Sequence, residues 1–254
     1  MHGPAGVLTV VLFEAALGGL ALLWAAPLWG VVRPGFFKLV GATVLACAAL
    51  AWLAGRSGLD QAGATGRAAL LWLTVFALAV LVWQVLLYAR VTASRWVGIA
   101  GVGPGLVAAW PLAVLSGRTA LGALALLTGA LFLGATVDGL LLGHWYLVDR
   151  RLTNRPILAL ATWFIAGVAA ALVSAALGGA RGEEVNQSLS PLLAFTNLTV
   201  YLAVGLVLLC GLLASFIRVL VRSNSIQAAT GMFYLAVIMA LAAEFAAKVY
   251  FFPG

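Results

Sequence analysis

Charged residues are scarce in this chain of 254 residues: they make up only 8% of it, whereas 65% is hydrophobic. Soluble domains carry about 25% charged and 45–50% apolar residues. A water-soluble fold could not bury this much hydrocarbon, so the soluble classes are excluded. Nucleic-acid binding is excluded with them, despite a formal net charge of +7. We therefore expect the lipid bilayer to be the main partner of the chain.

Histidine and cysteine are equally scarce, with two residues of each. Cys47 and Cys210 lie inside apolar runs, which argues against a disulfide scaffold. A membrane haem usually needs two axial His ligands, or one His and one Met, and we expect His2 and His144 to lie at opposite membrane faces. We expect no haem, no metal and no covalently bound cofactor. No nucleophile with a partnered base is visible, so we do not expect catalysis by the chain alone.

Long apolar runs are abundant, and a helix needs about 20 apolar residues to cross a hydrocarbon core of about 30 Å. No run shows the alternating pattern of a membrane β-strand. The sequence predicts an all-α, polytopic membrane protein, a single transmembrane domain over residues 1–254. The eight predicted spans cover residues 6–32, 35–54, 67–89, 94–116, 119–148, 156–178, 191–221 and 225–252.

The distribution of Lys and Arg predicts the orientation of these spans, because cytoplasmic loops carry the excess of both. One side holds nine: Arg33, Lys38, Arg90, Arg95, Arg150, Arg151, Arg155, Arg218 and Arg222. The other side holds four: Arg56, Arg67, Arg118 and Arg181. We expect the first side to be cytoplasmic and both termini to be extracytoplasmic. Usage rich in Ala, Gly, Leu and Arg suits a high-GC bacterium, so the predicted location is the bacterial inner membrane.

Two features hint at a four-plus-four helix repeat, a common plan in membrane proteins. The longest polar connectors, 55–66 and 179–190, follow the second and sixth spans. Arg33-Pro34 and Arg155-Pro156 follow the first and fifth.

The fourth span has an unusual sequence, with several glycines between Gly98 and Gly105 and then Pro111. Two interpretations are open: a broken helix whose backbone lines a site, or close packing by small residues with a proline kink.

Ionisable residues inside spans are expensive and often functional. Glu14 and Glu244 are predicted at similar depths in the outer half of the membrane. Lys248 follows Glu244 by four positions, on the same helical face. One interpretation is a Glu244–Lys248 ion pair with the lysine extending outward to the interface. The other is a carboxylate pair, Glu14 and Glu244, that binds a proton or a cation.

Asp138 is predicted near the midplane with no cation within one helical turn. We expect it to be protonated and to face the bundle interior as a proton relay or ligand-binding acid; a structural hydrogen bond to another helix is the alternative. Further along the same span, His144, Trp145 and Tyr146 are expected near the cytoplasmic interface. They form either a quinone-headgroup site or an ordinary aromatic belt.

Polar residues at three- and four-residue steps form stripes on the last two spans. Such stripes line bundle interiors or bind helices together, so we expect an interior position for Asn197, Tyr201, Arg218, Gln227 and Tyr234.

Eight spans with buried acids resemble the quinone-interacting membrane subunits of respiratory oxidoreductases, in helix count and composition only and without a diagnostic motif. The first functional hypothesis is therefore a membrane subunit of an electron-transfer complex. It would bind quinone and relay protons, as a non-catalytic part of an oxidoreductase, while partner subunits carry the redox cofactors. The second is a small proton- or cation-coupled transporter or channel for a lipophilic or small solute. The third is a membrane scaffold or assembly factor.

Overall fold

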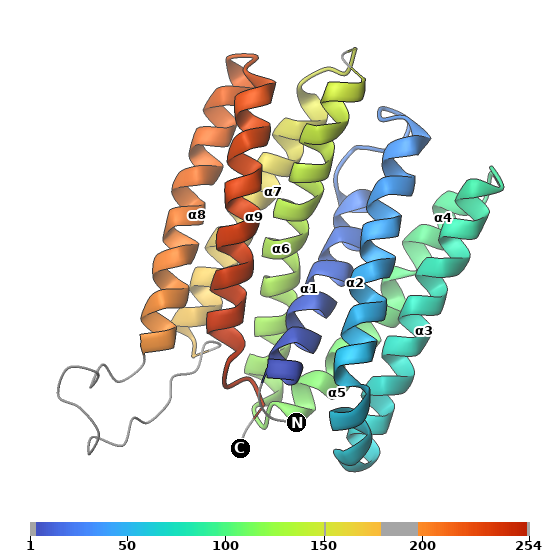
Figure 1. The fold of residues 1–254 in the computed structure, drawn as a ribbon, viewed down its shortest axis with the longest axis vertical. Helices are drawn as coiled ribbons and strands as arrows, with labels where there is room; N and C mark the ends of the chain where they lie inside the picture. Colours follow the sequence, from blue (N-terminus) through green and yellow to red (C-terminus); the bar gives the residue numbers. More distant parts are fainter. Residues whose placement is uncertain (1–3, 150, 179–197, 253–254) are drawn as a thin grey trace.

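The computed structural model describes residues 4–149, 151–178 and 198–252 (Figure 1). Every regular element within these ranges is a helix, and eight segments are long and apolar enough to cross a membrane. The helices are α1 (Pro4–Ala25), α2 (Pro34–Gln61), α3 (Gly63–Tyr88), α4 (Ser94–Ala100), α5 (Val102–Leu115), α6 (Thr119–Val148), α7 (Arg155–Ala176), α8 (Leu198–Arg222) and α9 (Ile226–Lys248). The predicted all-α class and the number of span-length helices are confirmed.

The first predicted span, 6–32, is too long, because α1 ends at Ala25. Pro27 follows two residues later; it lacks a backbone N–H and cannot continue the helix. Gly30 then takes the left-handed conformation at φ 81°. The chain reverses there, and α2 starts with Pro34 in its first turn, where a missing N–H costs nothing.

The prediction of a polar connector at 55–66 is wrong, because this stretch is almost entirely helical. Helix α2 continues to Gln61 and α3 begins at Gly63. The reversal is concentrated at Gly63, whose φ of 73° suits a residue without a side chain. The matching connector, 179–190, and residues 191–197 of the seventh predicted span lie outside the described residues.

Helices α4 and α5 together make the fourth span, and they are interrupted only at Gly101. The backbone of Gly101 stays close to helical, and its N–H donates to the Val97 carbonyl at 2.9 Å. A Cβ on Gly98 would overlap Trp24 and Trp83. This supports the interpretation that the glycines allow close packing.

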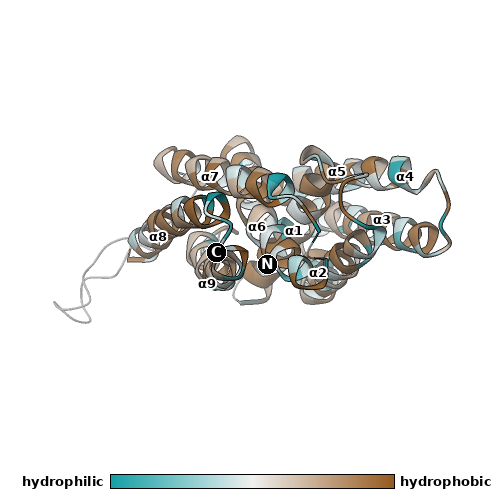
Figure 2. Cartoon of the chain, turned by 90° about the horizontal axis from the view of Figure 1, so that it is seen from above, coloured by the Kyte–Doolittle hydropathy of each residue, from teal (hydrophilic) through white to brown (hydrophobic). Residues whose placement is uncertain are grey.

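Helices α1 and α6 lie side by side at the centre of the bundle (Figure 2). A Cβ on Gly18 of α1 would overlap the backbone of Ala130 and Gly134 on α6, so the two backbones touch. Helices α2, α3 and α5 lie on one side of this pair and α7, α8 and α9 on the other. The four-plus-four repeat stays a prediction. Helix α1 starts and helix α9 ends at the same end of the bundle (Figure 1).

Candidate functional site: a buried cluster of charges

Three charged side chains meet where α1, α6 and α9 pack together, near the end of the bundle where α1 starts and α9 ends. Lys248 Nζ lies 2.8 Å from Glu14 Oε1 and 2.7 Å from Glu244 Oε2. It also donates a hydrogen bond to the Ala125 carbonyl oxygen at 3.2 Å. The ammonium has three N–H donors, so each of them has a partner. Glu14, Glu244 and Lys248 are 0%, 4% and 3% exposed.

Local structure explains how the three side chains meet. Glu244 and Lys248 are four residues apart on α9, so they lie on one face of the helix. Glu14 reaches them from α1 because Gly129 of α6 leaves room for it: a Cβ at Gly129 would overlap the Glu14 carboxyl group. A single small residue on the central helix therefore makes space for the second acid.

The formal charge of the cluster is −1 when both carboxylates are ionised. Burying an uncompensated charge is costly, because the low-dielectric interior replaces the hydration that water would supply. Among the described residues, Lys248 is the sole cation paired with either glutamate. The Glu14 Oε2 atom accepts no hydrogen bond from that part of the chain. One bound proton would make the cluster neutral.

The structure combines the two pairings that the sequence suggested for these residues. The Glu244–Lys248 pair exists, and Glu14 and Glu244 do come together. The expectation that Lys248 extends outward to the interface is wrong. Its side chain turns inward, because the second carboxylate, on α1, offers the ammonium a better partner than the interface does.

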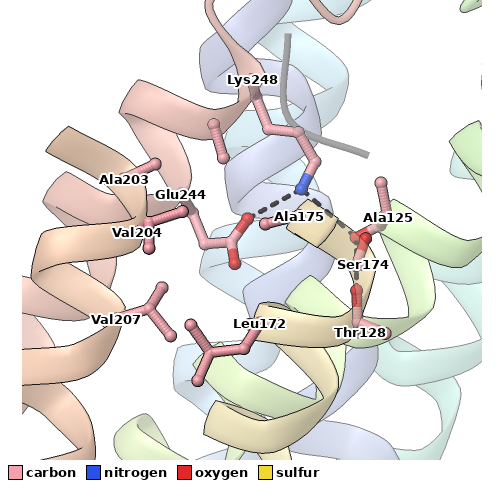
Figure 3. Close-up of a pocket in the computed structure, with 12 residues that line it drawn as sticks. Ala125, Thr128, Leu172, Ser174, Ala175, Ala203, Val204, Val207, Glu244 and Lys248 are labelled. Carbon is pink, nitrogen blue, oxygen red and sulfur yellow. Dashed lines mark hydrogen bonds and ion pairs between the residues drawn. The ribbon is translucent and has the colours of Figure 1, made fainter. Parts of the chain in front are cut away.

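A cavity of about 30 Å³ lies beside Glu244 and Lys248. A buried water needs roughly 10–15 Å³ measured in this way, so there is room for one or two waters. Figure 3 shows the lysine and the glutamate at its edge, with Thr128 and Ser174 close by. The wall is completed by Ala125, Ala171, Leu172, Ala175, Ala203, Val204, Val207 and Ala247.

Asp138 is fully buried on α6, as expected for an acid that faces the interior. Neither of its oxygens has a hydrogen-bond partner within the described residues. On α1, a Cβ added at Gly19 would lie 3.4 Å from Asp138 Oδ1. Asp138 follows Gly129 by nine residues, about 13 Å along the helix at 1.5 Å per residue. It is a second buried acid, separate from the cluster.

His144, Trp145 and Tyr146 do not converge on one site. His144 is exposed, and its Nδ1 atom lies 3.5 Å from the Tyr234 hydroxyl. Trp145 packs against Phe36 of α2, with ring centroids 6.3 Å apart. Tyr146 is buried and donates a hydrogen bond to the Thr153 carbonyl. Consecutive helical residues point about 100° apart, so this divergence follows from the helix itself.

The predicted interior stripe is largely wrong. Tyr201 and Tyr234 are 66% and 50% exposed, and Gln227 is exposed as well. Arg218 is half-buried and donates to Thr162 Oγ1 of α7 at 3.2 Å. Asn197 lies outside the described residues. The reason is that α8 packs through small and apolar side chains instead: Ala203, Val207, Cys210, Ala214, Ile217 and Val221.

Sequence reasoning missed one ion pair at the opposite end of the bundle. Arg33 Nε lies 2.9 Å from Asp149 Oδ2, and Asp149 is only 8% exposed. The pair joins the turn after α1 to the end of α6. The sequence did contain a signal for this pair: Asp149 directly follows the predicted span 119–148, on the side of the membrane that is richer in arginine.

Within the described ranges, no group of three or more His, Cys, Asp or Glu side chains is arranged to hold a metal ion. Comparison of the chain with protein-family models, curated proteins and solved structures finds no match.

Proposed function

We propose that this chain is an integral membrane protein that moves protons, with the Glu14–Lys248–Glu244 cluster and Asp138 as the proton-binding groups. The observation that carries the proposal is a fully buried set of two carboxylates and one ammonium beside a cavity large enough for water. Ionisable residues inside spans are rare because each costs roughly 2.5–3.5 kcal/mol or more, and they often mark proton pathways.

The charge balance supports a proton as the exchangeable species. Lys248 neutralises one of the two carboxylates, and one proton neutralises the other. Among the described residues, no cation forms an ion pair with Asp138, so its neutral form is favoured in the interior. The two sites lie about 13 Å apart along α6 by the helical rise, which suggests separate steps in proton movement.

The setting of this activity rests on the arginine distribution and on the short connectors. If the side with nine Lys and Arg is cytoplasmic in a bacterial inner membrane, the cluster lies in the extracytoplasmic half and Asp138 lies deeper. Buried acids at several depths suit a membrane subunit of an electron-transfer complex whose partners carry the redox groups. Quinone binding at His144, Trp145 and Tyr146 stays a prediction, and the divergence of the three side chains gives it little support.

A small proton-coupled transporter is the second candidate, and the cavity beside Glu244 favours it. Purification from the native membrane separates the two candidates. Co-purifying redox subunits support the first, and a homogeneous preparation of this chain alone supports the second. In a scaffold, the charges would be merely paired and would not exchange protons.

Infrared spectroscopy of the purified protein in nanodiscs tests the proposal without requiring a partner. When the pH falls, the carbonyl band of a protonated carboxyl group should grow, and Glu14→Gln or Glu244→Gln should remove that change. Asp60→Asn is the control, since Asp60 is exposed at the end of α2. A pH-dependent band that persists unchanged in both glutamine variants would exclude the cluster as a proton site.

A further inference from the structure

We infer that the cavity beside Glu244 is the aqueous entrance to the cluster, between α7 and α8, and that it admits protons and not metal cations. This inference rests on the proposed function. It adds the route and the substrate class of the same site, and the geometry of the cavity wall carries it.

The cavity touches only one side of the cluster. Glu244 and Lys248 line it and Glu14 does not. Glu14 contacts the same ammonium from α1 and packs against Gly129 of α6. Water in the cavity therefore has direct access to Glu244 alone. This gives an order: a proton reaches Glu244 first and Glu14 after it, through the contacts within the cluster.

The wall on the α7–α8 side combines alanines and the hydroxyl of Ser174 with larger apolar side chains, Leu172, Val204 and Val207. Ala171 and Ser174 come from the last turns of α7, and Ala203 comes from the first turns of α8. Alanine on both facing helices leaves a gap that larger side chains would close. Ser174 lies two residues before the end of α7, about 3 Å along the axis, so this wall of the cavity lies close to the end of the bundle.

The size of the cavity and the position of Lys248 argue against a metal cation. A buried water needs roughly 10–15 Å³ measured in the same way, so the cavity of about 30 Å³ has room for one or two waters. A cation that kept several waters would not fit. A bare cation would have to compete with the ammonium, which already lies 2.7–2.8 Å from both carboxylates. A proton needs only one bridging water and an oxygen of Glu244.

The test is the rate of hydrogen–deuterium exchange at the cluster, followed by the isotope shift of the carboxyl band after transfer into D₂O. Ala171→Leu fills the cavity from α7, where Ala171 is 9% exposed. Ala169→Leu is the matched control, because Ala169 is exposed on the same helix and does not line the cavity. Removing the bridging water should slow exchange by about tenfold or more in Ala171→Leu and leave the control at the wild-type rate.

The final position of the carboxyl band, after exchange is complete, distinguishes a variant with a blocked entrance from a variant that is misfolded. Ala171→Leu should reach the same final band as the wild type, only later, because the carboxyl groups remain. If this variant does not fold, Ala203→Leu closes the cavity from α8, where Ala203 is 3% exposed. Unchanged exchange in a folded cavity-filling variant, or equal slowing in Ala169→Leu, would overturn the entrance while leaving the proposed function intact.

Sodium tests the substrate class. NaCl should leave the exchange rate of the wild type unchanged at constant ionic strength, with choline chloride as the comparison salt. Slower exchange in sodium than in choline would show that a metal cation enters, and would overturn the selectivity for protons. Loss of the carboxyl band from the wild type itself would instead refute the proposed function.

Discussion

Removing the ammonium from the cluster should destabilise the protein strongly, and Lys248→Met is the variant that isolates this effect. Methionine keeps much of the length and apolar volume of lysine, so packing changes little. The lost ion pairs join Lys248 Nζ to two buried carboxylates at 2.8 and 2.7 Å. Removing one partner of a buried pair costs about 3–5 kcal/mol, because the remaining charge has no compensation. We expect a loss of this size in the free energy of unfolding at pH 8.

Acidification should reverse much of the loss. In Lys248→Met the folded state gains most from protonating its two unpaired carboxylates, so it binds more protons than the unfolded state does. Its stability therefore rises as the pH falls. The variant that also carries Glu14→Gln and Glu244→Gln has no buried charge left here, and should recover most of the stability at every pH.

The assay is equilibrium unfolding in detergent micelles, followed by tryptophan fluorescence. Wild-type stability of Lys248→Met at pH 8 would refute the reasoning. So would a triple variant as unstable as the single one, because the cost would then come from packing and not from charge.

Three further predictions follow from the packing, the second acid and the topology. Gly18→Ala should cost about 1–3 kcal/mol by overpacking, since its Cβ would overlap the backbone of α6, whereas Gly205→Ala, with nothing within 4 Å of its Cβ, should be neutral or stabilising in the same unfolding assay. Asp138→Asn should fold as the wild type does and lose proton movement in liposomes; unaltered proton flux would remove Asp138 from the pathway. Asp60→Cys should be labelled from the extracytoplasmic side and Arg151→Cys from the cytoplasmic side, and the reverse pattern would invert the topology.

Hydropathy predicted the number of span-length helices correctly, because it averages over about 20 residues and tolerates local errors. Hydropathy did not predict the helix ends correctly, because single residues determine where a helix stops. Pro27 is apolar enough to extend a hydropathy window and still ends the helix at Ala25. The polar stretch 55–66 has the opposite property, since it interrupts the apolar pattern while its backbone stays helical on both sides of Gly63.

The sequence predicted half of the charge cluster. The spacing of Glu244 and Lys248 places them on one face of a helix, but no helical periodicity shows which other helix faces them. Contact with Glu14 depends on the packing of α1 against α6 and α9, and on the absence of a side chain at Gly129. The predicted depth in the membrane was the one indication of this contact, because Glu14, Glu244 and Lys248 were all predicted in the same half of the membrane.

Formal charge and mere polarity differ as guides to what a helical bundle buries. The three acids predicted well inside the spans, Glu14, Asp138 and Glu244, are all buried. Tyr201 and Tyr234 are exposed, although the same reasoning placed them inside. A charged side chain at the membrane centre costs roughly 2.5–3.5 kcal/mol or more, which forces it toward a partner. A tyrosine pairs an aromatic ring with one hydroxyl and tolerates an interfacial position. A stripe of uncharged polar residues is therefore a poor predictor of the buried face of a helix. A single acid deep within a span is a much better one.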